Sequence, residues 1–184
     1  MRIISGKYKG RKIIPPANMK ARPTTDFAKE GLFDMLAHRI ELEGLSVLDL
    51  FSGTGFISYE FASRGASSVT AVEINPIHIT FIRKTAKELQ MPLYVVEADV
   101  FRYIEKVQAS FDIIFCDPPF DLDGLDRLPK LIFEHEILSE SGLLIIEHSK
   151  KNAFVDYPYF LHQRSYGKVQ FSFFSKNAQK YFFK

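Results

Sequence analysis

The sequence predicts an α/β protein with a Rossmann-like, doubly wound and mostly parallel sheet. Two observations lead to this prediction. From residue 46 onward, short apolar runs alternate with stretches of helical spacing, and the chain then ends in two adjacent strand-like runs. Strands that alternate with helices form a parallel sheet that helices cover on both faces. A chain of 184 residues is long enough for one such domain with a full hydrophobic core.

Residues 1–40 come before this alternation. "MRIISGKYKGRKIIPP" has two β-prone pieces around a glycine-containing turn, which predicts a basic N-terminal β-hairpin. "TTDFAKEGLFDMLAHRI" then predicts a helix with Thr25 or Asp26 as its N-cap. We therefore expect residues 1–40 to form an extension of a main domain that spans residues 41–184.

The remaining elements follow in a regular order. The predicted parallel strands are the apolar runs at residues 46–51, 68–74, 93–98, 111–116 and 142–148. The predicted helices lie at residues 55–63, 76–90, 100–107 and 125–138. The closing stretch "YFLHQRSYGKVQFSFFS" predicts an antiparallel hairpin with its turn near Gly167. Together these runs predict a seven-stranded sheet.

The charge of the chain is small overall but unevenly distributed. The net charge is +2, yet residues 1–22 carry seven Lys and Arg and no acid, and residues 149–184 carry seven with the lone acid Asp156. Two basic ends on an acidic middle indicate a protein that holds a polyanion at one face, although solvated tails are the alternative. The candidates for phosphate contacts are Arg2, Lys7, Lys9, Arg11 and Lys12.

Several classes of protein are disfavoured by composition. No apolar run is long enough to cross a bilayer and the N-terminus lacks a signal-peptide core, so we expect a cytoplasmic protein. The single Cys116 lies in an apolar run, which favours a buried thiol over a nucleophile. The five histidines lack metal-ligand spacing, and His148 alone is expected near the site, in a supporting role. We expect no metal centre.

The stretch "DLFSGTG", residues 49–55, follows the first predicted parallel strand. Gly53 and Gly55 allow a sharp turn and a close backbone approach to a ligand at a helix start. Glu73 ends the next strand, where it can accept hydrogen bonds from both ribose hydroxyls, and Asp99 ends the third strand, within reach of an adenine amine. Because parallel strands end at one edge, this pattern predicts an adenosine site; a purely structural glycine turn is the alternative.

The glycine pattern favours one adenosine compound over another. A dinucleotide-binding loop usually has a third glycine near the pyrophosphate, and Ser58 stands at that place here. The acidic residues Asp49 and Asp117 would tolerate a sulfonium, so the pattern favours S-adenosylmethionine. Neighbouring residues complete the predicted cofactor site: Phe51, Ile74 and Val100.

The stretch "FCDPPF", residues 115–120, ends the fourth predicted strand at the same edge. Proline fixes φ and has no N–H, so Asp117, Pro118 and Pro119 form a stiff, extended segment. The Asp117 carboxylate and the Pro118 carbonyl can accept both N–H hydrogens of a nucleobase amine while Phe120 stacks on the base. This segment predicts methyl transfer to that amine without a strong base or a metal. A strand that merely ends at proline is the alternative.

Several motifs together resemble a known family. They are "RIISGKYKGRKI" at the start, "RPTTD" at 22–26 with "GLFDML" after it, "VLDLFSGTG" at 47–55, "SRGASSVTAVE" at 63–73, "FDIIFCDPPF" at 111–120 and "YG" at 166–167. The chain is similar to the S-adenosylmethionine-dependent N-methyltransferases with a D/N-P-P-Y/F motif. More closely, it resembles the RsmD-like family of 16S ribosomal RNA guanine-N2 methyltransferases.

The resemblance implies a class I methyltransferase fold that acts on the N2 amine of a guanine in 16S ribosomal RNA, within an assembling small subunit. It implies that Arg22, Pro23, Thr24 and Thr25 lie near the cofactor and the target base. Residues 1–40 would then be an RNA-contact extension, and we expect a monomer. The chain departs from the family pattern at Phe27 and Ala28, where basic residues are usual, and at Ser5, where a glycine is usual.

Three other functions compete with this interpretation. An adenine-N6 DNA methyltransferase could use the same amine chemistry, but 184 residues leave little space for a target-recognition region. A nicotinamide-dependent oxidoreductase is disfavoured by Ser58 and has no use for the Asp-Pro-Pro-Phe segment. A non-catalytic RNA-binding scaffold would keep the basic ends but has no need of a cofactor edge.

Overall fold

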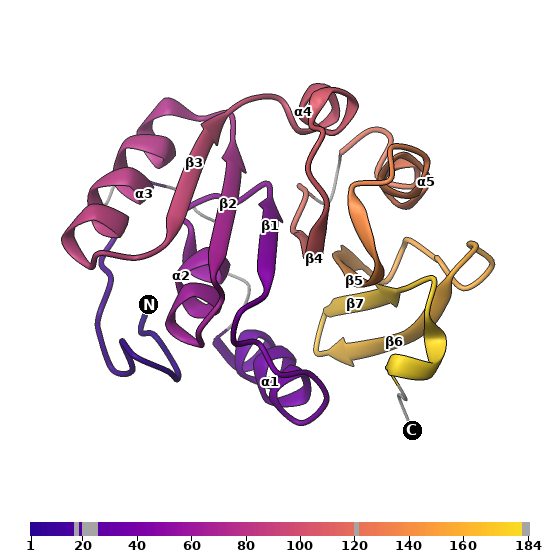
Figure 1. Cartoon of the computed structure of the whole chain (residues 1–184), viewed down its shortest axis with the longest axis horizontal. Coiled ribbons are helices and arrows are strands. Elements are labelled where there is room, and N and C mark those ends of the chain that lie inside the picture. The colour runs from indigo at the N-terminus through magenta and orange to yellow at the C-terminus, as the bar shows by residue number, and fades with distance from the viewer. Residues whose placement is uncertain (17–18, 20–25, 120–121, 182–184) are drawn as a thin grey trace.

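The computed structural model describes residues 1–16, 19, 26–119 and 122–181. Its centre is a seven-stranded sheet with the order β3-β2-β1-β4-β5-β7-β6 (Figure 1). The strands are β1 (Ser46–Leu50), β2 (Ser68–Glu73), β3 (Leu93–Glu97), β4 (Phe111–Cys116), β5 (Leu138–Ser149), β6 (Phe160–Tyr166) and β7 (Val169–Phe174). The helices are α1 (Asp26–Ala37), α2 (Phe56–Ser63), α3 (Pro76–Glu88), α4 (Val100–Lys106), α5 (Arg127–Glu134) and the short 3-10 helix η1 (Ala178–Lys180).

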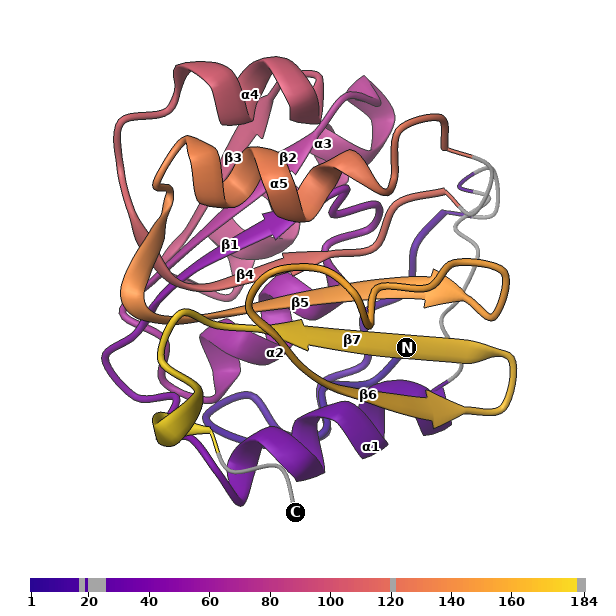
Figure 2. The same cartoon turned by 90° about the vertical axis from the view of Figure 1, so that its right-hand side faces the viewer.

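The pairing of the strands confirms the predicted fold class. Strands β1 to β5 pair in parallel, whereas β7 pairs antiparallel with both β5 and β6. Figure 2 shows the arrows of β1, β4 and β5 pointing the same way and β7 running against them. The carboxyl ends of the parallel strands therefore meet at one edge, where a Rossmann-like fold holds its ligand.

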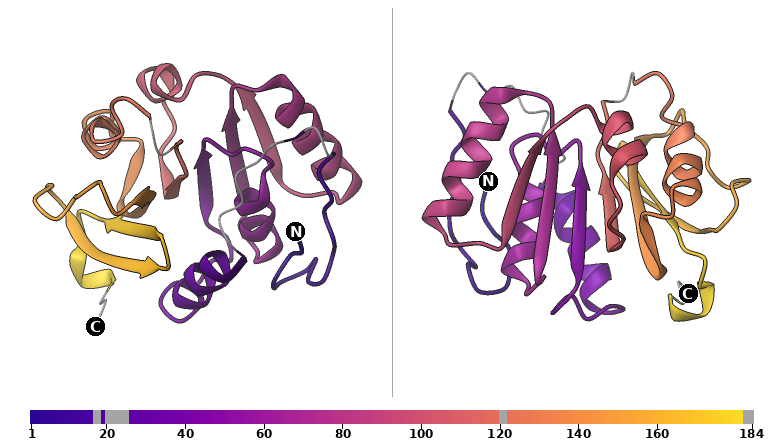
Figure 3. Two further views of the ribbon diagram at one scale, coloured as in Figure 1. Left: turned by 180° about the vertical axis from the view of Figure 1, so that it is seen from behind. Right: turned by 45° about the horizontal axis from the view of Figure 1, so that its top comes forward.

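Two hydrophobic cores lie on opposite faces of the sheet, and Figure 3 shows helices covering both faces. In β1 and β4, Val47 and Ile113 contribute to a core that also contains residues of α1, α2 and α3. The alternate residues Leu48 and Ile114 contribute to a second core with residues of α4 and α5. This alternation follows from the period-two geometry of a strand, and both faces are buried because helices cover both.

The N-terminal segment forms a short hairpin that packs on the first core. Arg2 and Lys12 form an isolated antiparallel bridge, and the Ile3 N–H donates to the Arg11 carbonyl at 3.0 Å. Ile3 and Ile13 are buried in the same core as α1 and α2. The hairpin is therefore part of the packed structure, and its apolar residues hold it there.

Glu60 of α2 fixes the backbone of this hairpin. The side chain of Glu60 is fully buried, and its carboxylate accepts hydrogen bonds from the N–H groups of Ile4 at 2.8 Å and Ser5 at 3.1 Å. Arg64 donates to the same carboxylate at 2.6 Å. Three charge-assisted hydrogen bonds thus satisfy a buried carboxylate that would otherwise be costly to bury.

The predicted boundaries of the last helix before the fifth strand, and of that strand, are wrong. The helix predicted at 125–138 ends at Glu134, because Glu136 has a φ of 53°, outside the helical region. The chain reverses there, and Leu138 begins β5 opposite Phe111 of β4. Leu138, which the helical pattern had included, therefore belongs to the sheet, and β5 begins before the strand predicted at residues 142–148. Among the helices of the described residues, none is long and apolar enough to span a membrane.

Candidate functional site

The glycine-containing loop between β1 and α2 lies at the carboxyl edge of the sheet. Phe51, Gly53 and Gly55 have positive φ angles of 61°, 55° and 79°. Side chains rarely tolerate this conformation, so glycine suits two of the positions and Phe51 is held in a strained one. The Gly55 N–H donates to the Ser52 carbonyl at 2.8 Å and closes the loop. The loop leads directly into the unpaired N–H groups at the start of α2.

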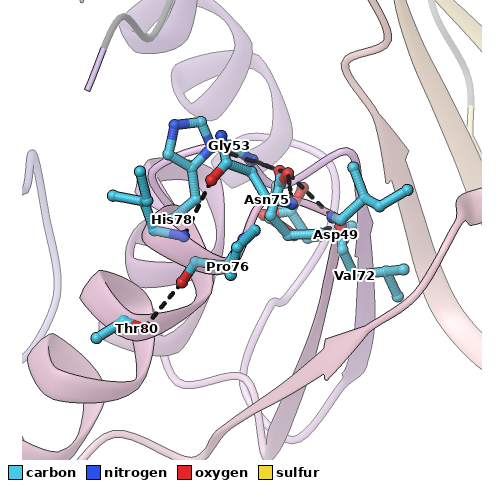
Figure 4. Close-up of polar contacts among 11 residues, drawn as sticks. Asp49, Gly53, Val72, Asn75, Pro76, His78 and Thr80 are labelled. Atoms are coloured by element: carbon cyan, nitrogen blue, oxygen red, sulfur yellow. Dashed lines mark hydrogen bonds and ion pairs between the residues drawn. The ribbon is translucent and has the colours of Figure 1, made fainter. Parts of the chain in front are cut away.

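Glu73 joins this loop to the turn after β2. One carboxylate oxygen, Oε2, accepts the Gly53 N–H at 2.7 Å, and the other, Oε1, accepts the N–H groups of Ile74 at 3.0 Å and Asn75 at 2.8 Å. His78 Nδ1 lies 3.8 Å from Oε1. Figure 4 shows Gly53, Asn75 and His78 gathered at this point. Glu73 therefore shapes the loop, and Oε2 keeps one lone pair for a further donor.

Asp49 lies beneath the loop with a partner that the sequence pattern did not identify. Its side chain is 1% exposed, and Ser58 Oγ donates to its Oδ2 at 2.5 Å. The pKa of Asp49 is raised to about 7, mainly by burial and also by the charges of Asp117 and Glu73, while the hydrogen bond from Ser58 lowers it. Ser58, interpreted from the sequence only as a missing glycine, is the buried residue that holds this carboxyl. The signal available in the sequence was a serine among the apolar residues at the start of a helix, which indicates a buried polar group in need of a partner.

The segment after β4 reaches the same edge. The Asp117 N–H donates to the Leu50 carbonyl at 3.3 Å, so the end of β4 is tied to the end of β1. Asp117 is half-buried, Pro118 is buried and Pro119 is exposed. The preceding Cys116 is buried, and burial together with the charges of Asp49 and Asp117 raises the pKa of its thiol well above the ordinary value. Cys116 is thus a structural thiol, as expected.

The other predicted cofactor residues have different surroundings. Asp99 is the N-cap of α4, and its Oδ1 accepts the Arg102 N–H at 3.0 Å. Ile74 is 64% exposed, whereas Val100 is buried in the second core. Five residues predicted to lie at the site are outside the described residues: Arg22, Pro23, Thr24, Thr25 and Phe120.

The predicted phosphate contacts all lie on the surface. Each of the five basic residues is exposed: Arg2, Lys7, Lys9, Arg11 and Lys12. Their backbone is nevertheless fixed, because the Lys7 N–H donates to the Ser63 carbonyl at 2.7 Å and the Tyr8 N–H to Ser63 Oγ at 3.0 Å. These basic side chains therefore extend from a backbone that is hydrogen-bonded to the end of α2.

His148 has a structural environment. Its Nδ1 donates to the Ser149 carbonyl and its Nε2 lies 2.8 Å from Ser172 Oγ. The ring is fully buried, and burial lowers its pKa, which favours the neutral form. Within the described residues, no group of three or more His, Cys, Asp or Glu could hold a metal ion.

Comparison with known proteins identifies the family. A family described as Conserved hypothetical protein 95 matches residues 1–175. Ribosomal RNA small subunit methyltransferase D of Buchnera aphidicola is 36% identical over 149 residues, which make up 80% of this chain and 75% of that protein. The chain belongs to this RsmD-like methyltransferase family.

Other members of the RsmD-like family extend the similarity to the whole length. The protein of the same name from Escherichia coli is 29% identical over 183 residues, or 97% of this chain and 91% of that one. The solved structure of the Escherichia coli protein yhhF has a TM-score of 0.84 and 27% identity, and covers 97% of this chain and 99% of that chain. The predicted methyltransferase identity and the Rossmann-like fold are therefore confirmed.

Proposed function

We propose that this RsmD-like methyltransferase transfers a methyl group from S-adenosylmethionine to the N2 amine of a guanine in 16S ribosomal RNA. The observation that carries the proposal is the position of Asp117, which is hydrogen-bonded to the end of β1 beside the glycine loop. The names of the relatives, ribosomal RNA small subunit methyltransferase D, support ribosomal RNA as the substrate.

The residues at the carboxyl edge fit this cofactor. When bound, S-adenosylmethionine supplies an electrophilic methyl group on a positively charged sulfonium. Asp49, Glu73 and Asp117 provide three carboxyl groups at this edge, where the charges of Asp117 and Glu73 help to raise the pKa of Asp49. A Cβ added at Gly53 would meet only the Phe51 carbonyl oxygen, at 4.0 Å, so the backbone there is open to a ligand. Glu73 Oε2 has a lone pair for a ribose hydroxyl, and Asp99 and Ile74 extend the site toward the base.

Asp117 and Pro118 hold the target amine. The lone pair of a guanine N2 amine is delocalised into the ring, so the amine is a weak nucleophile unless it is oriented. The Asp117 carboxylate and the Pro118 carbonyl accept its two N–H hydrogens, which fixes the direction of the lone pair. The nitrogen becomes acidic as it is methylated, so Asp117 acts as an acceptor without being a strong base. Pro119 stiffens the segment and Phe120 stacks on the base.

The RNA is held by charge. A base must leave its stack to reach Asp117, which is easiest in an RNA loop. The exposed cations of the N-terminal hairpin contact the phosphates around it, so residues 1–40 serve as an RNA-contact extension of the methyltransferase domain, residues 41–184. The family resemblance assigns a role near the cofactor to three residues that lie outside the described residues: Arg22, Thr24 and Thr25. The enzyme acts as a monomer on the assembling small subunit.

Transfer of labelled methyl from S-adenosylmethionine to small-subunit particles that lack the modification tests this function. Nucleoside analysis should place the label in N2-methylguanosine. Asp117→Ala should reduce the rate by roughly 100-fold or more, with cofactor affinity unchanged within a few fold. Asp156→Ala, which removes an exposed carboxylate from the loop before β6, is the matched control and should retain full activity. Label in DNA adenine, with none in ribosomal RNA, would replace this function with the adenine-N6 alternative.

A further inference from the structure

A surface pocket lies between α1 and β6, away from the N-terminal hairpin. Its volume is about 310 Å³, and its lining includes Asp34, His38, Arg39, Arg164 and Tyr166. Tyr166 joins the two walls, because its hydroxyl donates to the Gly31 carbonyl at 2.9 Å. The pocket is therefore built by two elements that are held together, rather than by a single loop.

Positive charge dominates this pocket. Arg39 and Arg164 both lie close enough to His162 to lower its pKa, in addition to the larger effect of burial. Arg164 Nε is buried and has no hydrogen-bond partner among the described residues. A buried donor without a partner is costly, and the guanidinium of Arg164, which lines the pocket, carries further N–H donors that suit an anion there. Asp34 is the single acid of the lining.

Further basic residues lie at the carboxyl edge of the sheet. Ser149 and Tyr166 both pair with Val169, so the turn after β5 and the turn between β6 and β7 lie at the edge where Asp117 lies. Three lysines on these turns are exposed: Lys150, Lys151 and Lys168. The only acid in residues 149–184 is Asp156, so little opposes their charge.

We propose that this C-terminal basic surface, formed by Lys150, Lys151, Lys168, Arg39 and Arg164, binds the phosphate backbone of the substrate RNA beside the target base. The inference rests on the proposed function and adds to it a second RNA-binding surface. Figure 1 shows the hairpin β6–β7 and the N-terminal hairpin on opposite sides of the molecule. Arginine suits the pocket because its planar fork matches phosphate oxygens.

Two variants test this surface. Lys151→Glu with Lys168→Glu reverses two exposed charges that pack on nothing in the core. Arg39→Gln with Arg164→Gln removes the guanidinium groups of the pocket. Each should raise the Kd for 16S ribosomal RNA roughly 10-fold and reduce the slope of log Kd against log salt concentration by about 1 to 2. Lys106→Glu with Lys130→Glu, on α4 and α5, is the charge-matched control and should leave both quantities unchanged.

The outcomes separate this inference from the proposed function. The Kd for S-adenosylmethionine and the Tm are measured for every variant, and both should match wild type for the lysine pair. Wild-type affinity for RNA in both variants overturns the inference, even if N2-methylguanosine is still formed. The variants could instead bind naked RNA normally but bind small-subunit particles more weakly. That result would show that the surface binds an acidic protein of the particle, and it would also overturn the inference. Failure of the wild type to methylate ribosomal RNA would overturn the proposed function itself.

Discussion

At the scale of single residues, the carboxyl groups of the site have distinct tasks. Glu73 accepts three backbone N–H groups and so gives the glycine loop its shape. Asp49 is buried and accepts the Ser58 hydroxyl. Asp117 is half-buried after β4, where it can meet a substrate. The same functional group thus holds the backbone of the loop in Glu73, is a buried acid with a raised pKa in Asp49 and, in the proposed function, accepts the target amine in Asp117.

Asp49 should make both stability and cofactor affinity depend on pH. Its pKa is raised from 3.8 to about 7, so the folded protein holds a proton that the unfolded chain releases. The stability that this proton contributes is complete below about pH 4 and is lost as the pH rises through about 7. Asp49→Asn cannot ionise, so its Tm relative to wild type should rise between about pH 4 and pH 7. Affinity for the cationic cofactor should tighten as the pH rises through about 7, in wild type only.

Ser58→Ala is the matched variant for this prediction. The Ser58 hydrogen bond lowers the pKa of Asp49, so its removal should move the transition to higher pH. Calorimetric binding of S-adenosylmethionine and thermal melts across the pH range measure both effects. An unaltered pH dependence in Asp49→Asn would show that another group titrates.

Gly55→Ala should weaken cofactor binding and destabilise the fold. Gly55 has a φ of 79°, and an added Cβ would lie 2.9 Å from Ile82 Cγ1 and 3.0 Å from Tyr59 Cζ. We expect a loss of about 2 to 4 kcal/mol in the free energy of unfolding, measured by urea denaturation, from backbone strain plus overpacking. Gly10→Ala has a φ of 85° but no atom within 4 Å, so it should cost only about 1 to 2 kcal/mol. An equal loss in the free energy of unfolding of the two variants would show that the close contacts at Gly55 contribute nothing.

At the scale of elements, α2 connects the glycine loop to the N-terminal hairpin. Its first residue follows the glycine loop, and its later residues Glu60 and Ser63 accept hydrogen bonds from the hairpin. At the other end of the sheet, Tyr166 holds the hairpin β6–β7 against α1. Gly31 makes this possible, because a Cβ there would lie 2.1 Å from Tyr166 Cε1. Both basic surfaces are thus supported by helices on one face of the sheet.

Glu60→Gln should loosen the N-terminal hairpin. The Glu60 carboxylate now accepts three N–H donors, from Ile4, Ser5 and Arg64. The side-chain amide of the variant would turn its NH2 group toward one or more of these donors, and at least one of them would lose its partner. The expected cost is roughly 1 to 3 kcal/mol in the free energy of unfolding. Hydrogen exchange at the amides of Ile4 and Ser5 should accelerate. Glu88→Gln, which alters an exposed ion pair with Lys84, should cost less than about 1 kcal/mol; slow exchange at Ile4 in Glu60→Gln would contradict this role.

At the scale of the whole molecule, two basic ends lie on an acidic body. The N-terminal cations are exposed on a hairpin that packs on the first core, so charge reversal there need not disturb the cofactor loop. If these cations bind RNA as proposed, RNA binding and cofactor binding should be separable. RNA binding should then also weaken with salt, because each phosphate contact releases a counterion.

Arg11→Glu with Lys12→Glu should weaken RNA binding and leave cofactor binding intact. We expect the Kd for 16S ribosomal RNA to rise roughly 10-fold at moderate salt, while the Kd for S-adenosylmethionine stays within twofold. Filter binding at several salt concentrations and calorimetry measure the two constants. An equal loss of affinity for RNA and for S-adenosylmethionine would contradict the proposal that the hairpin binds RNA and the carboxyl edge binds the cofactor.

Much of the fold and of the site edge could be predicted from the sequence. The alternation of apolar runs and helical stretches determined a parallel sheet with a terminal hairpin, because periodicity is a local property of the chain. The Gly53–Gly55 turn, Glu73 and Asp117 were then assigned to one edge, because parallel strands end on the same side. Cys116 was recognised as a buried thiol from its apolar neighbours alone.

Only the tertiary structure decided which buried groups pair with one another. Glu60 and the Ser5 N–H are 55 residues apart in the chain, and Asp49 meets Ser58 only because α2 packs beside β1. The end of the fifth predicted helix was likewise set by the pairing of Leu138 with Phe111. No local pattern encodes these contacts. Burial removes water from a polar group, and the partner that replaces it is whichever residue the packing of distant segments brings within reach.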